Sequence, residues 1–413
     1  MSIMNTRKIL YIGIFSGSNI GDLVISNNIY EYLKKKYLHV DCMDIISLRK
    51  INLPGTDITI ANNDKMKYKV YRALYANDIF RRIYNGYLEI ILIKDTHESY
   101  AIYKKIVQEY DLICIGGGNL LMSIMDNRLA MKLNVITKIA KAANKKIFIM
   151  SVGAGPILLN KSKKLFKDVL ENVDYITTRD EYSRSILKNE LYINKKIDIS
   201  GDPALLLDCN DFQLGEHNLD NDDTINISIS IMPFGKKGFP NLSYYKDHKY
   251  YLDMYKHMVE YLYGRDSRYV FYLFSTELSD YQTILELYNY IINNSKNVTK
   301  RNLKIEYVKS LSDLLNFYRG QNLLIGTRMH SLIIGFTQSL PIISISWQKK
   351  VDSFMTYVDL TSYCYQLNNV DTDLENIYIN IQQLLKFGRQ NNKNKLIYMR
   401  KIYDDMNSCY ISA

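Results

Sequence analysis

Arg328 and His330 stand two residues apart in the stretch GTRMH, where an apolar strand-like run gives way to a helix-like run. The planar guanidinium group of arginine suits a phosphate or a carboxylate, and the amino end of a helix adds positive potential. The imidazole group of histidine exchanges a proton near neutral pH. The pair predicts a site that binds an anion and moves a proton. A capping or ion-pair role inside the fold is the alternative.

Four further polar residues follow apolar runs that read as strands. Asp22 closes the stretch SGSNIGD, Asn119 follows three glycines, Arg179 lies in TTRD and Asp202 lies in GDPA. Ligands of open parallel sheets bind beyond the carboxyl ends of the strands, so we expect these residues to meet the arginine–histidine pair at one site. Two alternatives stay open. Asp22 is also placed to cap the next helix, and Arg179 is also placed to pair with Asp180 or Asp202.

The glycine-rich turns match no nucleotide-binding fingerprint. Glycine at a strand end permits a positive φ and brings backbone N–H groups close to an anion. The sequence has neither the spaced G-x-G-x-x-G pattern with its acidic partner nor the Walker pattern ending in G-K-[ST]. The five cysteines are dispersed, without the spacing of a metal site or a disulfide framework. We therefore expect no cofactor, no metal and reduced thiols.

The composition describes a globular protein of about two domains. The chain has 413 residues, of which 47% are hydrophobic and 23% charged. A net charge of +10 favours an anionic substrate, a nucleic acid or an anionic membrane surface as partner. Nucleic-acid binding lacks support, because neither a basic aromatic strand surface nor a recognition helix is evident. The first apolar stretch is too short to span a bilayer, and we expect a cytoplasmic protein.

Strand-like and helix-like segments alternate in two series. The first series has strands at 8–15, 111–118, 145–155, 173–180 and 196–204, with helices at 21–37, 126–143 and 181–189. The second series has strands at 225–233, 269–275, 303–308, 322–326 and 341–347, with helices at about 246–263, 279–293, 312–320 and 329–338. Continuous apolar strands alternating with helices are typical of parallel sheets covered on both faces.

This alternation predicts an α/β protein with two facing Rossmann-like domains. The first domain covers residues 1–210 and the second covers 224–368, joined by an acidic, aperiodic linker at 210–223. The tail, 369–413, is expected to form helices that cross back to the first domain.

A basic and aromatic segment lies inside the first domain at about 64–100. In residues 64–93, lysines and arginines alternate with tyrosines and a phenylalanine. Such a helix suits peripheral contact with the inner face of an anionic membrane. A helical insertion packed on its own domain, with a solvated basic face, is the favoured alternative.

These motifs, in this order, resemble the polysaccharide pyruvyl transferase family. The matching pieces are NIGD, DLICIGGGNLL, SVGAGPI, ITTRDEYS, GDPALLL and the long block that begins GTRMH, and they span about residues 8–360. In that block the family has arginine, histidine, proline, an aromatic residue and lysine at set places, which Arg328, His330, Pro341, Trp347 and Lys350 fill here. Trp347 stands where the family more often has tyrosine.

The resemblance implies a GT-B-like arrangement of the two domains. It also implies that the enzyme moves a pyruvyl group from phosphoenolpyruvate to a sugar of a bacterial capsule, exopolysaccharide or cell-wall precursor. The product is a cyclic ketal, and phosphate is released.

Each candidate residue has an expected role in that reaction. Arg328, Arg179 and Lys350 would bind the donor, although a plain surface lysine is the alternative for Lys350. Protonated His330 would supply a proton to the methylene carbon of the donor, and neutral His330 would deprotonate an attacking hydroxyl group. Asp22 would orient the acceptor or the histidine.

Asn119 and Asp202 would contact the glycan or lipid-linked acceptor. Two other functions compete with this one. The first is a GT-B glycosyltransferase that uses a nucleotide sugar, and the second is a non-catalytic protein that binds a membrane surface or a glycan.

Overall fold

The computed structural model describes residues 5–47, 49–51, 86–87, 90, 100, 103–124, 126–208, 224–234, 248–389 and 392–411. The predicted linker at 210–223 lies outside the described residues. So does the predicted insertion at 64–100, apart from residues 86–87, 90 and 100.

The first domain is built on a seven-stranded sheet of order β3-β2-β1-β4-β6-β8-β9. All neighbouring strands are parallel except the short edge strand β3. The strands are β1 (Asn5–Gly13), β2 (Tyr37–Asp44), β3 (Lys50–Ile51), β4 (Leu112–Gly116), β6 (Lys146–Val152), β8 (Tyr175–Thr178) and β9 (Asp198–Ile199). Helices α1 (Ile20–Lys34), α4 (Arg128–Ala142), α5 (Asn160–Asn172) and α6 (Glu181–Asn189) flank the sheet, with the 3-10 turn η1 (Pro203–Leu206) and a small sheet of β5 (Leu121–Ser123) and β7 (Ala154–Ile157).

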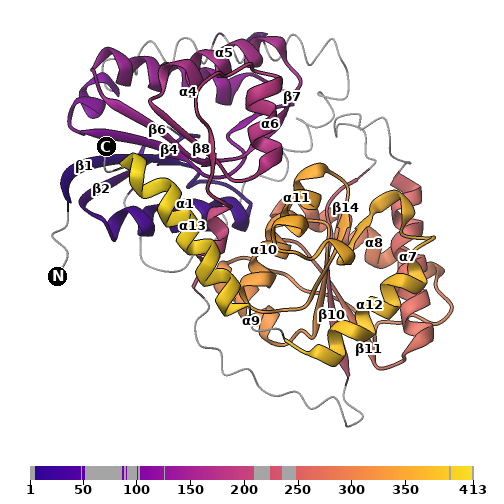
Figure 1. Ribbon diagram of the computed structural model, residues 1–413. Helices are drawn as coiled ribbons and strands as arrows, with labels where there is room; N and C mark the ends of the chain where they lie inside the picture. The colour runs from indigo at the N-terminus through magenta and orange to yellow at the C-terminus, as the bar shows by residue number, and fades with distance from the viewer. Residues whose placement is uncertain are drawn as a thin grey trace.

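The second domain has a six-stranded, fully parallel sheet of order β12-β11-β10-β13-β14-β15. Its strands are β10 (Ile225–Ser230), β11 (Tyr269–Phe274), β12 (Leu303–Ile305), β13 (Leu323–Gly326), β14 (Ile342–Ser346) and β15 (Cys364–Gln366). Its helices are α7 (His248–Arg265), α8 (Tyr281–Asn294), α9 (Leu311–Arg319), α10 (Met329–Thr337) and α11 (Lys349–Tyr357), with the short turns η2 (Leu278–Asp280), η3 (Thr361–Tyr363) and η4 (Leu367–Asn369). Figure 1 shows the two sheets as separate layers with helices on both faces.

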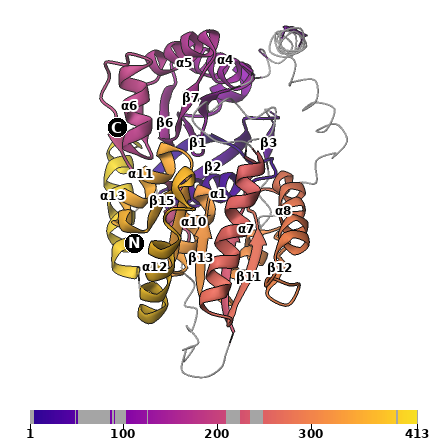
Figure 2. The same cartoon turned by 90° about the vertical axis from the view of Figure 1, so that its right-hand side faces the viewer.

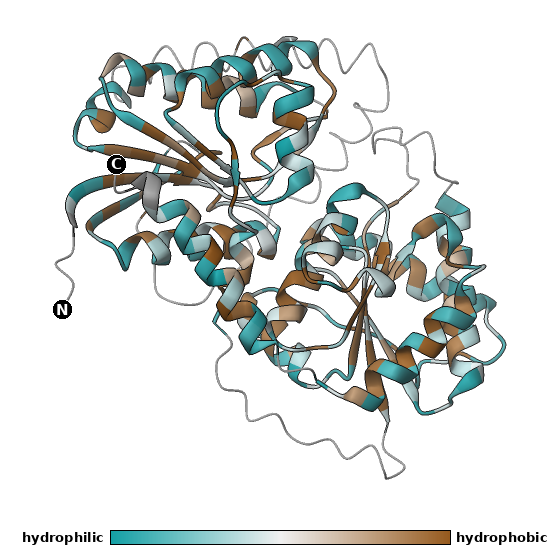
Figure 3. Cartoon of the chain, in the orientation of Figure 1, coloured by the Kyte–Doolittle hydropathy of each residue, from teal (hydrophilic) through white to brown (hydrophobic). Residues whose placement is uncertain are grey.

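The strands are apolar along their length because helices cover both faces of each sheet. Every residue of β4, β13 and β14 is buried. In Figure 3 the strands at the centre of each domain are brown, and the outward faces of the helices are teal. The predicted class, an α/β protein with parallel sheets, is confirmed.

Two elements of the first domain differ from the prediction. The predicted helix at 21–37 ends at Lys34, and Tyr37 already begins β2, which pairs with β1. Strand β2 pairs at the rim of the sheet, and three of its eight residues are exposed, so it lacks a continuous apolar run. Helix α5 was not predicted, although its buried residues Phe166, Val169 and Leu170 recur at helical spacing, which is the pattern of an amphipathic helix.

The tail forms two helices that pack on different domains. Helix α12 (Leu374–Phe387) contributes Ile377 and Ile381 to the core of the second domain. Helix α13 (Lys393–Ile411) lies against the first domain, where Asn407 accepts a hydrogen bond of 3.0 Å from Thr177 of β8. Figures 1 and 2 both place α13 alongside the first domain and α12 alongside the second.

The two domains share one continuous apolar core. Ile20 and Val24 of α1 and Leu205 of η1 belong to the same buried cluster as Met329 and Ile333 of α10. This shared core fixes α1 against α10, and so brings the end of β1 to the end of β13. None of the described helices is long and apolar enough to cross a membrane.

Candidate active site

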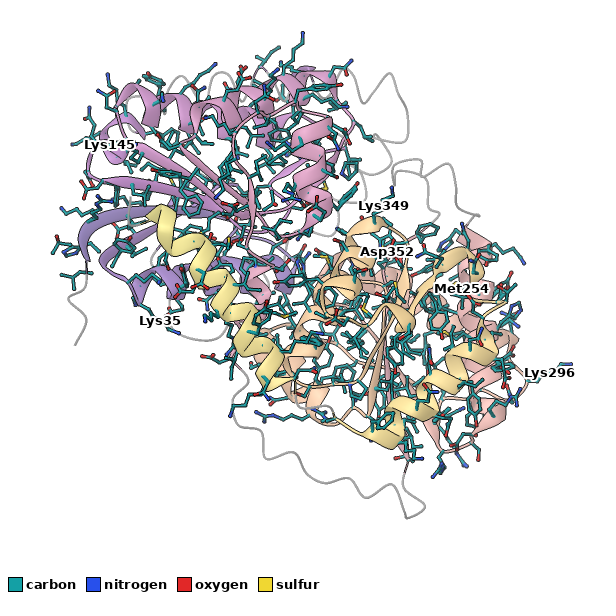
Figure 4. All side chains as sticks on the ribbon, viewed as in Figure 1. Lys35, Lys145, Met254, Lys296, Lys349 and Asp352 are labelled. Carbon is teal, nitrogen blue, oxygen red and sulfur yellow. The ribbon has the colours of Figure 1, made fainter. Side chains whose placement is uncertain are left out.

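The carboxyl edges of the two sheets face each other, and a pocket lies between them. Its walls come from both domains and are formed by Arg179, Asp180, Asp202, Leu205, Met329, Ile333, Lys350, Ser353, Phe354 and Tyr357. The lining therefore combines charged side chains with apolar ones. In Figure 4, Lys349 and Asp352 of α11 mark the side of the second domain that is turned toward the first.

His330 lies in the first turn of α10, against the first domain. Its imidazole ring packs so closely on Gly21 that a Cβ atom at that position would lie 2.1 Å from Nδ1. Nε2 lies 3.9 Å from an oxygen of Asp202 and is buried without a hydrogen-bond partner among the described residues. The side chain as a whole is 12% exposed. His330 is thus held in place by packing on Gly21, and its Nε2 atom remains available to another partner.

The pKa of His330 lies well below its ordinary value. Burial is the main cause, followed by the positive charges of Arg179, Lys350 and Arg328. The imidazole is therefore neutral at physiological pH, although the lowered pKa makes it a weaker base than an ordinary histidine. This favours the second of the two roles expected for His330, deprotonation of an attacking hydroxyl group.

Arg328 is engaged in an ion pair inside its own domain. Its Nε and Nη2 atoms donate to the two carboxylate oxygens of Asp280 at 2.8 and 2.6 Å. Asp280 is buried and also accepts a hydrogen bond of 2.6 Å from Ser275. The ion-pair alternative for Arg328 is thus present in the structure, and only Nη1 lacks a partner among the described residues.

Arg179 is likewise paired, and it is almost fully buried. Nε donates to Asp180 at 3.1 Å and Nη1 donates to Asp202 at 3.3 Å. Both aspartates also serve as caps, since Asp180 accepts from the backbone of Ser183 and Asp202 accepts from that of Ala204. Burial raises the pKa of Asp202 although the Arg179 guanidinium opposes the rise. The charge of Arg179 is thus already balanced by two carboxylates, Asp180 and Asp202, before any ligand arrives.

Lys350 is different, because it has neither an ion pair nor a hydrogen bond among the described residues. It lies in the first turn of α11 and lines the pocket, with its ammonium group 6.0 Å from the centre of the Trp347 ring. Burial, together with the charges of Arg179 and Arg328, lowers the pKa of Lys350 to about 7. An anion bound here would restore the charged form of the amine.

Asp22 does not cap α1, because that position belongs to Asn19, whose side chain accepts from the backbone of Gly21 at 2.9 Å. The carboxyl group of Asp22 makes no hydrogen bond within the described part of the chain. It faces Gly118, where a Cβ atom would lie 3.2 Å from Oδ1. Burial and the nearby charge of Glu277 raise the pKa of Asp22 to about 6, against the opposing charges of Lys350 and Arg179. Asp22 is thus a carboxyl group that can carry a proton near neutral pH.

Asn119 lies beside this group, at the end of β4. Its amide nitrogen donates to the backbone oxygen of Gly155 at 3.0 Å, and its Oδ1 atom is buried without a partner. Gly153 packs between Asn119 and Arg179, since a Cβ there would lie 2.8 Å from Oδ1 and 2.7 Å from the guanidinium carbon. Asn119 therefore offers an acceptor that no described side chain uses.

Three residues near the site were not predicted from the polar residues at strand ends. Glu277 and Asp280 follow β11 in the stretch TELSD, just as Arg179 follows β8 in TTRD. The same argument applied to β11 would have found them. Tyr357 lies in the last turn of α11 and lines the pocket with a buried, unbonded hydroxyl group. No pattern around it signals this position.

No group of three His, Cys, Asp or Glu side chains is arranged to hold a metal ion within the described ranges. The groups of the site without a hydrogen-bond partner among the described residues are instead one amine, one imidazole, one carboxyl group, one amide oxygen and the hydroxyl group of Tyr357. These groups bind and transfer protons and hold organic anions or hydroxyl groups.

Two parallel α/β domains that meet at the carboxyl edges of their strands define a GT-B-like architecture. A glycosyltransferase from Rickettsia africae has this fold, with a TM-score of 0.54, 12% identity, and coverage of 97% of this chain and 99% of that one. A UDP-GlcNAc 2-epimerase from Neisseria meningitidis gives a TM-score of 0.53 at 9% identity, covering 96% and 94%. A putative UDP-N-acetylglucosamine 2-epimerase from Listeria monocytogenes gives 0.52 at 10%, covering 93% and 91%. At these identities the likeness concerns the fold alone.

The sequence itself identifies the family. The model of the polysaccharide pyruvyl transferase family matches residues 19–349, most of the chain, and the chain belongs to that family of transferases. None of the curated proteins matches the chain significantly. The match contains Arg179, Arg328 and His330 and ends one residue before Lys350.

Proposed function

We propose that this protein transfers the pyruvyl group of phosphoenolpyruvate to a sugar of a cell-surface polysaccharide or of its lipid-linked precursor. The product is a cyclic ketal across two hydroxyl groups, and phosphate is released. The observation that carries the proposal is the set of unpartnered groups between the domains, Lys350, His330 and Asp22, in a chain of this family.

The mixed lining of the pocket supports phosphoenolpyruvate as the donor. Its carboxylate and phosphate need cations, and Lys350 is the cation that no described carboxylate already pairs. Arg179 borders the same pocket, while Arg328 contributes its charge and its remaining Nη1 atom. The methylene carbon of the donor is apolar, and Ile333 and Phe354 offer an apolar wall for it.

The proton movements follow from the two unusual pKa values. The first sugar hydroxyl adds to C2 of the donor and gives its proton to a base, while the methylene carbon takes a proton from an acid and becomes a methyl group. The C–O bond to phosphate then breaks, and the second hydroxyl adds to C2 and passes its proton to the departing phosphate. Asp22, with a pKa of about 6, is our candidate for the acid that supplies the methyl proton. Neutral His330 is our candidate for the base that accepts a hydroxyl proton.

The acceptor would approach from the side of the first domain. The free Oδ1 atom of Asn119 is placed to accept a hydrogen bond from a sugar hydroxyl. Asp202 is already bonded to Arg179 and Ala204, so we assign it to orienting the site and to an outer acceptor contact. We place this reaction in the cytoplasm, at the inner face of the membrane where the acceptor is lipid-linked.

The direct test is release of phosphate from phosphoenolpyruvate, screened over short lipid-linked and nitrophenyl glycosides. We expect release that depends on the acceptor, together with a product heavier by one pyruvylidene group. Equilibrium binding separates the competing function. A pyruvyl transferase binds phosphoenolpyruvate without metal, whereas a nucleotide-sugar glycosyltransferase prefers a nucleoside diphosphate. Tight binding of uridine diphosphate with none of phosphoenolpyruvate would overturn the proposal.

A further inference from the structure

The loop after β1 is bonded directly to the loop after β11 of the other domain. The backbone N–H of Ile20 donates to Thr276 at 2.9 Å, and that of Leu278 donates to Ser18 at 3.1 Å. Between them, Asn19 and Glu277 form an isolated antiparallel bridge. We call residues 18–20 and 276–278 the interdomain bridge.

One side chain reinforces the interdomain bridge. The hydroxyl group of Ser18 donates to the carboxylate of Glu277. A hydrogen bond to a charged acceptor is stronger than one between neutral groups. Glu277 also accepts from the backbone of Ser279, which fixes its position at the start of η2. Glu277 therefore ties the end of β1 to the end of β11.

The interdomain bridge sets the position of two candidate catalytic groups. Gly21 follows the bridge directly and packs on the ring of His330 without room for a Cβ atom. Asp22 comes next, and Glu277 is the nearby charge that most favours its protonated form. The apolar core still joins α1 to α10 without the bridge, but the first turn of α1 would then be free to shift, so that Gly21 would leave the ring of His330 and Asp22 would lose the influence of Glu277.

We propose that Glu277 is a positioning residue that holds the domains closed through Ser18, so that Asp22 and His330 share one site only while the interdomain bridge is formed. The reaction assigned to that site rests on the function proposed above, whereas the closure itself does not. Glu277 acts through Asp22 and need not touch the substrate.

Amide hydrogen exchange tests the closure without any substrate. The N–H groups of Ile20 and Leu278 are protected only by the opposite domain. We expect Glu277→Ala and Ser18→Ala to speed exchange at both amides by at least about tenfold, because each removes a charge-assisted hydrogen bond. Glu277→Gln keeps an acceptor for Ser18 and should have a smaller effect.

Two controls accompany this measurement. Glu190→Ala removes a surface ion pair with Lys163 in the first domain and should leave both amides unchanged. The amide of Leu324, bonded to Pro341 inside the second domain, reports whether a variant has lost its fold. Unchanged exchange at Ile20 and Leu278 in Glu277→Ala would overturn the proposal, whatever the activity.

The pH dependence of turnover tests the effect on Asp22. The charges that face its carboxyl group are Glu277, Lys350, Arg179 and Asp202, and only the first is altered in Glu277→Gln. If Asp22 must be protonated, turnover falls as the pH rises through its pKa. Glu277→Gln lowers that pKa, so the fall should begin at a lower pH than in the wild type.

The outcomes of the two measurements are separable. If the wild type and Glu277→Gln had the same pH profile, the charge of Glu277 would have no effect on Asp22, even if pyruvyl transfer were normal. Faster exchange in Glu277→Ala would support the role of the interdomain bridge. If the wild type never released phosphate, the proposed function would be wrong while the bridge proposal would stand.

Discussion

The cations at the carboxyl edges of the two sheets differ in whether they have a carboxylate partner. At the first edge, Arg179 is buried and its charge is already paired with the carboxylates of Asp180 and Asp202. At the second edge, Lys350 is equally close to the pocket but has no carboxylate partner among the described residues. Lys350 is partly buried, and a cation withdrawn from water without a partner is destabilising, so its position is best explained by a ligand that provides the partner. The cation at the first edge is paired within the protein, whereas the cation at the second edge is available to bind an anionic ligand.

Arg328 combines the two situations, because it is paired with a carboxylate and its charge also acts on the site. Two of its nitrogens are held by Asp280, as at the first edge, yet its charge still acts on Lys350 and His330. It keeps the neighbouring amine and imidazole easy to deprotonate, although it is not itself among the residues that line the pocket. Arg328 thus affects the site mainly through the electrostatic effect of its charge on Lys350 and His330.

The largest effect should come from the unpartnered imidazole. His330→Ala should lower turnover about 10²–10⁴-fold, because a positioned acid or base contributes that much. Binding of phosphoenolpyruvate should stay within a few-fold, as measured by calorimetry beside the phosphate-release assay. His257→Ala, a surface histidine paired with Asp371, is the matched control. A variant that keeps more than about a tenth of wild-type turnover would contradict this role.

Removal of a carboxylate from the buried Arg328–Asp280 pair should lower stability. Asp280→Ala leaves the Arg328 guanidinium partly buried without its partner, and we expect the free energy of unfolding to fall by roughly 3–5 kcal/mol. Denaturant unfolding measures it. Asp371→Ala removes a surface pair in the same domain and should cost at most about 1 kcal/mol. Equal losses in the two variants would mean that the buried pair is no more than a surface contact.

The unpaired cation predicts a loss of donor affinity instead. Lys350→Ala should weaken binding of phosphoenolpyruvate by roughly 10- to 100-fold, the equivalent of one charge-assisted hydrogen bond. The exposed neighbour Lys349 provides the control, since Lys349→Ala should bind as the wild type does. Wild-type affinity should decline as the pH rises above about 7, where free Lys350 loses its proton, and this decline should vanish in Lys350→Ala. Equal affinity in the two alanine variants would place the donor elsewhere.

The smallest effect concerns the carboxyl group of Asp22. Its pKa is raised in the folded state, so ionisation opposes folding, and this penalty grows as the pH rises from about 4 to about 6. Asp22→Asn should therefore raise the free energy of unfolding at pH 7 by about 1–2 kcal/mol. The same comparison at pH 4 should show little gain, and turnover should be lost at both. A variant less stable than the wild type at pH 7 would show that Asp22 is well solvated or paired.

Much of the fold was predictable from the sequence because its signals are local. The strands at 111–118, 225–233 and 341–347 are continuous apolar runs, and each forms a buried parallel strand close to those bounds. Strand β2 was missed, since three of its eight residues are exposed and it lacks a continuous apolar run. Helix α5 was missed although Phe166, Val169 and Leu170 recur at helical spacing. The family was predictable from motifs, and the match over residues 19–349 confirms it.

The sequence by itself determined that polar residues stand at the carboxyl ends of apolar strands, because strand period and turn glycines are encoded within a few residues. Only the tertiary structure decided which of those residues are already satisfied. Arg328 meets Asp280, 48 positions away along the chain, whereas Lys350 meets no carboxylate within the described ranges. The protonation of His330 and Asp22 likewise depends on burial and on charges from the opposite domain. Electrostatic interactions act through space, and the pairing of charges follows from the folded contacts rather than from sequence spacing.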